Sequence, residues 1–232
     1  FGVPSPDPSV WTADLPAAVA AAGKGQLLIM SVVGTIREGF TPHDYYDDFA
    51  NAAGLAKRAA AHVVEINLSC PNVASEGVIC YNRTAVTEIC RRTKAALGDT
   101  PLIIKIGYFT QDQQNTLEEI VRDVVPYVSA ISAINTLQGT IVDANGEQAL
   151  PGPGRLKSGV CGAGIRWAGL DMVRRLDALR KREGYKYEII GVGGVMTPAD
   201  FAEYRTAGAD VVQAVTAPMW NPLLAQEIKA VV

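Results

Sequence analysis

Short apolar and β-branched runs alternate along the chain with longer stretches in which apolar and polar residues mix. Thr41-Pro42 and Thr197-Pro198 predict helix starts, because Thr caps a helix and Pro suits its first turn, and Gly208 predicts a helix end. The apolar runs have the length and residue types of strands, and they fall at residues 27–33, 63–68, 102–106, 128–134, 187–192 and 210–215. We predict helices near residues 41–61, 84–97, 113–125, 168–182 and 197–208, and a last helix from residue 221.

This alternation predicts an α/β fold. Strands that are apolar at nearly every position are buried on both faces, which is typical of a parallel sheet covered by helices. A (β/α)8 barrel and an open doubly wound sheet both fit this description. No GxGxxG motif follows the first strand, which disfavours the dinucleotide-binding form of the open sheet. No linker or repeat divides the sequence, so we predict a single domain over residues 1–232.

The composition of the 232 residues narrows the class of protein. Hydrophobic residues make up 48% and charged residues 19%, which is typical of a globular chain. The net charge of −3 and the lack of a basic cluster disfavour nucleic acid and anionic membranes as partners. No uninterrupted apolar stretch is long enough for a membrane span. Four cysteines without CxxC spacing and only two histidines disfavour a metal site and a disulfide framework, so we expect a cytoplasmic protein.

Two of the predicted loops are longer than ordinary connections. They cover residues 70–83 and 136–166, and each follows the carboxyl end of a predicted strand. Long ordered loops at this end of an α/β sheet commonly form binding sites. The sequence from Asp143 to Gly146 predicts a small hairpin within the second loop.

Polar groups that no strand requires gather at the strand ends. If the strands are parallel neighbours, these groups meet at one rim of the sheet. They are Asn67, Cys70, Asn72, Lys105, Asn135, Thr136, Gly193, Gly194 and Thr216.

Lys105 and Cys70 each allow two interpretations. Lys105, between two isoleucines, either extends its stem to solvent or provides a fixed cation that stabilises negative charge on a bound group. Free cysteines are usually inert buried hydrophobes, which we expect for Cys90 within a helix. Cys70 instead follows a strand and precedes a proline in a long loop, where its thiolate could act as a base. His62 precedes a strand and His43 lies in the first turn of a helix, so neither is placed to activate a nucleophile.

"GVGGV" and "AVTAP" together have the pattern of a phosphate site. Glycines let backbone N–H groups approach an anion, and Thr216 adds a hydroxyl group beside a predicted helix start. In (β/α)8 enzymes such sites follow the last two strands, which is where both segments lie. The alternative is that Gly193-Gly194 only forms a tight turn.

With these residues identified, the chain resembles the class 1 dihydroorotate dehydrogenases, which are FMN-containing (β/α)8 barrels. The matching segments extend over nearly the whole chain, and they follow one another in the same order as in the family. It rests on "NLSCPN" (67–72), "PLIIKIGYF" (101–109), "SAINTLQGTIVDANG" (132–146), "GVCGAGIR" (159–166), "IIGVGGV" (189–195) and "VVQAVTAPMWNP" (211–222). "NLSCPN" is specific to such enzymes, whereas the glycine motifs occur in many FMN barrels.

The resemblance implies a role for each matched residue. Cys70 matches the base that removes the C5 proton of dihydroorotate while a hydride leaves C6 for the flavin, and Lys105 matches a lysine beside the flavin pyrimidine edge. Asn67, Asn72 and Asn135 match amides that bind the substrate, and Asn67 also lies near the flavin. The matches to FMN contacts are Ile134, Gly162, Gly193, Gly194, Val215 and Thr216. The family also implies a homodimer, and an electron acceptor that these segments do not identify.

Three departures from the family pattern leave alternatives open. Thr136 stands where the family usually has Ser, and an Asn-Thr pair resembles the dihydropyrimidine dehydrogenases, which reduce uracil-type bases. Val215 replaces a glycine of the phosphate motif. "FGVPSPDP" resembles the loop after the family's second strand, so we expect the chain to represent the barrel from that point onward. A barrel that binds a phosphate ligand without redox chemistry is the second alternative.

Overall fold

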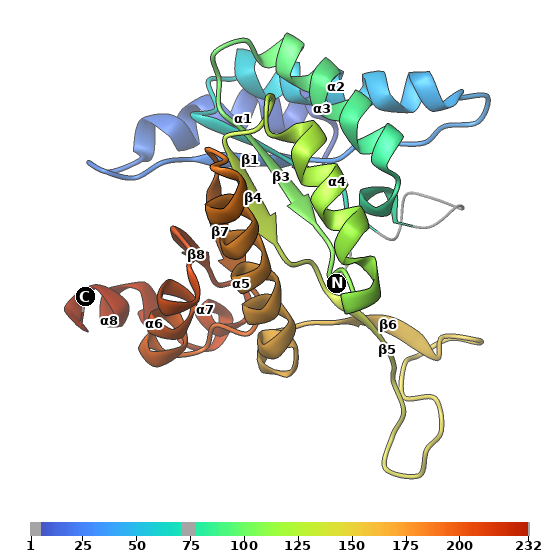
Figure 1. Cartoon of the computed structure of the whole chain (residues 1–232), viewed down its shortest axis with the longest axis vertical. Coiled ribbons are helices and arrows are strands. Elements are labelled where there is room, and N and C mark those ends of the chain that lie inside the picture. The colour runs from blue at the N-terminus through green and yellow to red at the C-terminus, as the bar shows by residue number, and fades with distance from the viewer. Residues whose placement is uncertain (1–5, 71–77, 232) are drawn as a thin grey trace. The chain divides into compact units, whose positions relative to one another are not determined.

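The computed structural model describes residues 6–70 and 78–231 and divides into two compact units (Figure 1). The first unit comprises Phe1–Ile106, Thr110–Ile131 and Tyr185–Tyr187. The second comprises Gly107–Phe109, Ser132–Gly184 and Glu188–Val232. Strand β4 (Ala130–Ala133) begins in the first unit and ends in the second.

The first unit is built on a parallel sheet. Its elements are α1 (Pro8–Ala21), β1 (Ile29–Val32), α2 (Pro42–Arg58), β2 (Val63–Asn67), η1 (Ile79–Tyr81), α3 (Arg83–Leu97), β3 (Leu102–Ile106), η2 (Gln111–Gln113), α4 (Gln114–Val124) and the start of β4. Strand β2 lies between β1 and β3, and both pairings are parallel. The start of β4 continues the sheet beside β3, because the Ser129 N–H donates to the Leu102 carbonyl at 2.8 Å.

One face of these strands packs against the helices of the first unit. Val32, Ile66 and Ile104 are paired across β1, β2 and β3 and are all buried. Paired residues of parallel strands point to the same face, so their neighbours Ser31 and Glu65 point to the other. Helix α3 contributes Cys90 to the core; this cysteine is fully buried, and burial raises the pKa of its thiol. Cys90 therefore has the structural role that the sequence predicts.

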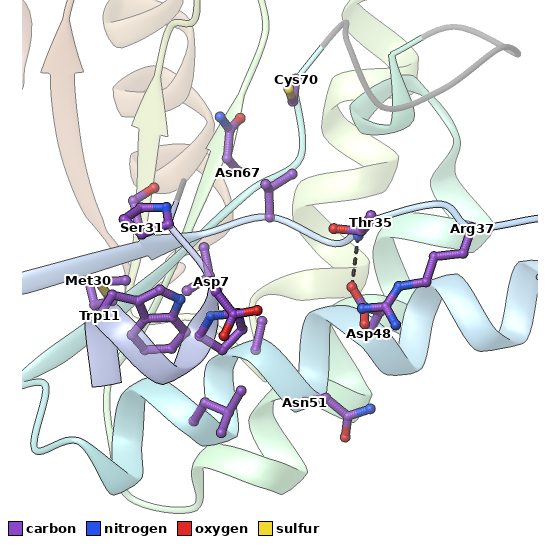
Figure 2. A pocket seen from close by; sticks show the side chains of 16 residues that line it. Asp7, Trp11, Met30, Ser31, Thr35, Arg37, Asp48, Asn51, Asn67 and Cys70 are labelled. Atoms are coloured by element: carbon purple, nitrogen blue, oxygen red, sulfur yellow. Dashed lines mark hydrogen bonds between the residues drawn. The ribbon is translucent and has the colours of Figure 1, made fainter. Parts of the chain in front are cut away.

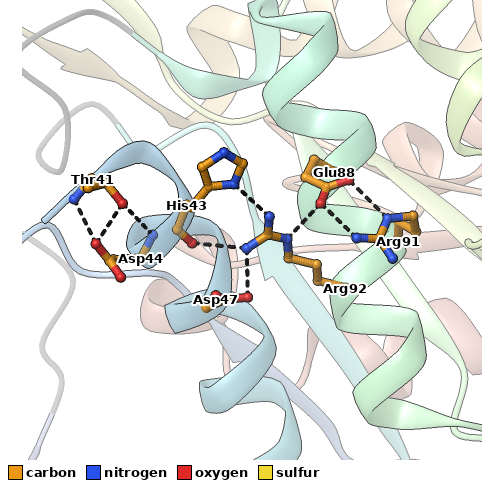
Figure 3. A network of polar contacts seen from close by, with 7 residues as sticks. All are labelled: Thr41, His43, Asp44, Asp47, Glu88, Arg91 and Arg92. Atoms are coloured by element: carbon orange, nitrogen blue, oxygen red, sulfur yellow. Dashed lines mark hydrogen bonds and ion pairs between the residues drawn. The ribbon is translucent and has the colours of Figure 1, made fainter.

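Polar side chains join α2 to α3 at the surface (Figure 3). Arg92 Nε donates to Glu88 Oε1 at 2.8 Å, and Arg92 Nη1 donates to Asp47 Oδ1 at 2.8 Å. Nη2 of the same guanidinium lies 2.7 Å from His43 Nδ1. His43 is exposed, as predicted, but it contributes to the contact between the two helices.

The second unit contains the end of β4 and two further parallel strands. Its other elements are β5 (Leu137–Thr140), β6 (Lys157–Val160), η3 (Gly162–Ile165), α5 (Arg166–Glu183), β7 (Glu188–Val192), α6 (Pro198–Ala207), β8 (Val211–Gln213), α7 (Thr216–Trp220) and α8 (Leu224–Val231). Strands β7 and β8 pair in parallel, and the Ile134 N–H donates to the Val192 carbonyl at 3.0 Å just after β4. Strands β5 and β6 form the separate antiparallel hairpin in Figure 1.

The predicted elements are all present, and most are shorter than predicted; β3 has the predicted bounds, whereas α5 extends beyond the predicted 168–182 at both ends. Strands β1, β4 and β8 are each shorter than the apolar run that predicts them, and the last helix begins at Leu224 rather than at 221. The helix starts at Thr41 and Thr197 are confirmed as complete capping boxes. The turn predicted from Asp143 to Gly146 is also confirmed, since the Gly146 N–H donates to the Asp143 carbonyl.

Helices α1 and α7 are absent from the predictions. In α1 only Leu15 is buried and a proline lies inside the helix, so the sequence shows no apolar stripe of helical period. Helix α7 has five residues, too few for a period to be visible. Of the helices in residues 6–70 and 78–231, none has the length and apolarity needed to cross a membrane.

We predict that Gly34→Ala destabilises the first unit. A Cβ atom at Gly34 would lie 2.5 Å from Phe49 Cδ2 and 3.0 Å from Tyr45 Cε2, and both rings are buried. Overpacking of this kind costs about 1–3 kcal/mol. Urea denaturation should show this loss, whereas the control Gly54→Ala, inside α2, meets only Arg58 Nη1 at 3.4 Å and should be neutral or stabilising. Equal stabilities for Gly34→Ala and the wild type would contradict the packing.

A second prediction concerns pH. Hydrogen bonds from Arg91 and Arg92 lower the pKa of Glu88 to about 2, from an ordinary value of 4.5. Glu88 therefore contributes to the free energy of unfolding above about pH 5 and loses this contribution as the pH falls toward 2. The stability difference between the wild type and Glu88→Gln should shrink over that range in denaturation measurements. Glu183→Gln, which removes an exposed pair with Arg182, serves as the control and should show a smaller pH dependence.

Candidate active site

The carboxyl ends of β2 and β3 bring two predicted site residues together. Asn67 and Lys105 are partners in the parallel register of the two strands, so both side chains point to the face opposite the helices. Asn67 Oδ1 accepts from the Ser69 N–H at 3.1 Å and from Ser69 Oγ at 3.2 Å. This turn directs the chain from the strand to Cys70, which is 6% exposed.

A pocket of about 680 Å³ lies beside this turn (Figure 2). Figure 2 shows Asn67 and Cys70 on one side and Asp48 and Asn51 of α2 on the other. The pocket lining consists of Pro6, Asp7, Pro8, Trp11, Met30, Ser31, Val32, Val33, Thr35, Arg37, Asp48, Asn51, Ala52, Leu55, Asn67 and Cys70. It combines apolar walls with a few polar groups and a thiol, which is the usual character of a small-molecule site.

Tyr45 of α2 contributes to the surroundings of Cys70. Burial, followed by the negative charges of Cys70 and Asp48, raises the pKa of Tyr45 to about 12. Its hydroxyl group therefore keeps its proton at neutral pH. The ring is held against Phe49 at a centroid distance of 5.2 Å, and Gly34 provides the space beside both rings.

Ser31 and Glu65 are site residues that the sequence predictions do not include. Ser31 lines the pocket, and Ser31 Oγ donates to Glu65 Oε1 at 2.7 Å. Glu65 is 5% exposed although its side chain is ionisable. The signal that could identify it is the same one that identifies Lys105: an ionisable residue inside an otherwise apolar strand.

The predicted phosphate site assembles in the second unit. Gly162, Gly193 and Gly194 have φ values of +76°, +129° and +69°, which glycine adopts without strain. A Cβ atom at Gly194 would lie 2.7 Å from the Gly162 carbonyl oxygen, and one at Gly162 would lie 3.8 Å from Thr216 Cγ2. The two glycine segments and Thr216 are therefore neighbours, although they are distant in sequence. The Thr216 hydroxyl group lies 3.8 Å from the thiol of Cys161.

The remaining predicted residues also belong to the second unit. Ile134 is buried and hydrogen-bonded to β7 through its N–H group. Asn135 is half-buried, and Thr136 packs so closely on Gly159 that a Cβ there would lie 2.4 Å from Thr136 Oγ1. Val215 is 71% exposed. Its side chain therefore points to solvent at the position where the family pattern has glycine.

The structure thus brings the predicted residues together in two groups. The first unit holds Asn67, Cys70 and Lys105, and the second holds Ile134, Asn135, Thr136, Gly162, Gly193, Gly194, Val215 and Thr216. Asn72 lies outside the described residues. Among residues 6–70 and 78–231, no three His, Cys, Asp or Glu side chains are grouped to hold a metal ion.

The second group has the properties that a phosphate requires. A Cβ atom at Gly194 would lie 2.7 Å from the Gly162 carbonyl oxygen and 2.9 Å from Arg166 Cβ, so the close packing of these two segments requires glycine at this position. Backbone N–H groups and the Thr216 hydroxyl group are donors suited to phosphate oxygens. The residues present therefore fit the phosphate end of a flavin nucleotide.

Comparisons with known proteins identify the family. Residues 24–231 match the family model described as dihydroorotate dehydrogenase. A dihydroorotate dehydrogenase of Dictyostelium discoideum is 37% identical over 98% of this chain and 61% of the relative. The catalytic subunit of a dihydroorotate dehydrogenase B (NAD(+)) from Trichlorobacter lovleyi is 32% identical over 82% of this chain and 58% of the relative. A dihydroorotate dehydrogenase A (fumarate) of Lactiplantibacillus plantarum is 31% identical over 80% of this chain and 58% of the relative.

The chain spans about three-fifths of the length of these relatives. The family is flavin-dependent and is built on the (β/α)8 barrel, so the predicted fold class is confirmed. The order of parallel strands and helices in each unit agrees with this architecture. The fold and the matched residues lead to one conclusion: this chain belongs to the dihydroorotate dehydrogenase family.

Proposed function

We propose that this chain carries the active site of an FMN-dependent dihydroorotate dehydrogenase, which oxidises dihydroorotate to orotate in pyrimidine biosynthesis. One observation supports the proposal most directly. Asn67 and Cys70 line a single pocket, and Asn67 is the register partner of Lys105. An amide, a thiol and a cation are the groups that hold a planar ring, remove a proton from it and stabilise the charge that develops.

Cys70 is the proposed base. Its Sγ takes the proton from C5 of dihydroorotate, and the electrons of that C–H bond form the C5–C6 double bond as a hydride leaves C6. Burial of Cys70 excludes water, which would otherwise compete for the proton. The Tyr45 hydroxyl group, whose pKa is raised to about 12, keeps its own proton and so does not compete with Cys70 for the role of base.

Lys105, Asn67, Asn135 and Thr136 are proposed to hold the reacting groups. Lys105 is half-buried at the end of β3, where a fixed cation lowers the energy of negative charge on a bound ring. The amides of Asn67 and Asn135 can each donate and accept, which suits the alternating groups of a pyrimidine and a carboxylate. Thr136 keeps the hydroxyl group that a serine would supply.

FMN is the proposed cofactor, and when bound it would supply the acceptor for the hydride that leaves C6. The backbone at Gly162, Gly193, Gly194 and Val215 and the Thr216 hydroxyl group would hold its phosphate. Ile134 would contribute a backbone contact. We also infer a cytoplasmic homodimer, which sedimentation of the FMN-loaded protein can test.

We predict that Cys70→Ala slows flavin reduction by dihydroorotate and leaves FMN bound. A positioned general base contributes about 10²–10⁴-fold, so single-turnover reduction in stopped flow should slow by at least about 100-fold. Cys80→Ala is the control, because Cys80 is also buried but does not line the pocket. An unchanged rate of reduction in Cys70→Ala would exclude the base assignment.

We further predict that Thr216→Val weakens FMN binding but not riboflavin binding. The valine keeps the shape of the side chain and removes a hydroxyl donor, which is worth about tenfold in affinity toward a charged phosphate. Riboflavin lacks the phosphate, so its dissociation constant should stay the same in fluorescence titrations. Thr206→Val, whose hydroxyl donates to the Ala202 carbonyl within α6, is the control. Equal weakening of both flavins would show that Thr216 supports the fold rather than the phosphate.

A further inference from the structure

A buried tyrosine that the proposed function does not use contacts the glycine turn of the second unit. Tyr204 of α6 is completely buried, and its hydroxyl group donates to the Gly193 carbonyl at 2.7 Å. Burial raises the pKa of Tyr204, so the hydroxyl group keeps the proton that it donates. One buried hydrogen bond therefore joins α6 to the turn that follows β7.

Two other glycines provide the space for this tyrosine. A Cβ atom at Gly169 of α5 would collide with Tyr204 Oη, and a Cβ atom at Gly191 of β7 would collide with Tyr204 Cδ1. The phenol ring thus lies in a closely fitted space between a helix and a strand. Its hydroxyl oxygen has a defined position as a result.

The hydrogen bond from Tyr204 fixes the orientation of one peptide unit. The peptide between Gly193 and Gly194 is trans, and in a trans peptide the carbonyl and the N–H group point in opposite directions. Because the Gly193 carbonyl points to Tyr204, the Gly194 N–H points away from it. Glycine has the widest choice of backbone conformations, so this peptide could turn over if the hydroxyl group were absent.

The same helix also holds the other end of the turn. Asp200 lies one helical turn before Tyr204 in α6 and is 5% exposed. Its Oδ2 accepts from the N–H groups of Met196 and Thr197, each at 2.9 Å. These two N–H groups are therefore already satisfied within the protein.

The Gly194 N–H is in a different condition. Gly194 is buried, and within residues 6–70 and 78–231 its N–H group donates to no acceptor. A buried N–H group is unfavourable without a partner, so an acceptor supplied by a ligand would satisfy it. Gly194 packs against Gly162, which lies near Thr216, so this donor belongs to the proposed phosphate site.

We propose that Tyr204 is a positioning residue of the phosphate site, which directs the Gly194 N–H to an anionic phosphate group by holding the carbonyl of the same peptide. The inference rests on the proposed function and adds a residue to its FMN site. Tyr204 itself does not contact the phosphate, because its one proton is donated to Gly193.

The first test compares two flavins that differ by the phosphate. The full chain is titrated with FMN and with riboflavin, and the quenching of flavin fluorescence gives both dissociation constants. Tyr204→Phe removes the hydroxyl group and keeps the ring. We expect it to weaken FMN binding by about tenfold, which is the worth of one hydrogen bond to a charged group, and to leave riboflavin binding unchanged.

Tyr187→Phe is the matched control for this substitution. Tyr187 is 3% exposed and directly precedes β7, whereas Gly193 directly follows it. The control thus removes a hydroxyl group from another buried tyrosine at the opposite end of the same strand. We expect it to leave both dissociation constants unchanged.

A second test observes the peptide directly. Gly193 and Gly194 are the only consecutive glycines in the sequence. Glycine labelled with ¹³C at the carbonyl and with ¹⁵N therefore lets a carbonyl-correlated NMR spectrum select the Gly194 amide alone. In the wild type its proton should move downfield with FMN but not with riboflavin, and in Tyr204→Phe the movement should be smaller. This measurement applies even if the loss of the hydroxyl group lowers the stability of the fold.

The outcomes separate this inference from the proposed function. If the wild type binds FMN no better than riboflavin, the proposed phosphate site fails and the inference fails with it. If the wild type prefers FMN and Tyr204→Phe keeps both that preference and the Gly194 shift, the inference is overturned and the proposed function stands. If Tyr204→Phe weakens both flavins alike, Tyr204 has only a structural role, and the inference is again overturned.

Discussion

The parallel pairing of β1, β2 and β3 is the constraint on which the candidate active site depends. Paired residues of parallel strands share a face, so the register places Ser31 beside Glu65 and Asn67 beside Lys105. A shift of β2 by one residue would turn its polar side chains toward the helices and expose Ile66 instead. The apolar residues on the helix-covered face therefore fix the positions of the polar residues on the other face, and the core determines the chemistry of the pocket.

This dependence explains how the fold tolerates a buried acid. Glu65 gains one hydrogen bond and leaves one oxygen without a partner in the part of the chain that the structure describes. The strands remain in place because Val64, Ile66 and Ile104 are almost completely buried on the opposite face. A buried acid departs from the usual rules of burial, and such departures commonly mark functional sites. Here the hydrogen-bond partner of Glu65, Ser31, lines the pocket that contains Cys70.

Sequence reasoning succeeds where local physical rules decide the structure. Thr41 and Thr197 cap their helices because the capping box is a short-range interaction, and Asn67, Cys70 and Lys105 gather because strand ends of a parallel sheet share a rim. It fails where the partner is distant. Ser31 and Glu65 are 34 residues apart, and only the register joins them. Helix α1 shows no apolar stripe of helical period. Assignments that rest on Asn72 or on the family alone stay predictions.

The two units differ in the chemistry that they offer to a ligand, and this difference limits what the protein can bind. In the first unit Ser31, which donates to the buried Glu65, lines the same pocket as Asn67 and Cys70. In the second unit Thr216 lies near Gly162, which packs against Gly194, and both glycines have positive φ values, a combination suited to an anion. A sugar phosphate would use only the glycine segments and Thr216 of the second unit. The amide and thiol in the pocket of the first unit are groups that the proposed redox chemistry uses, whereas a barrel that only binds phosphate would leave them without a role.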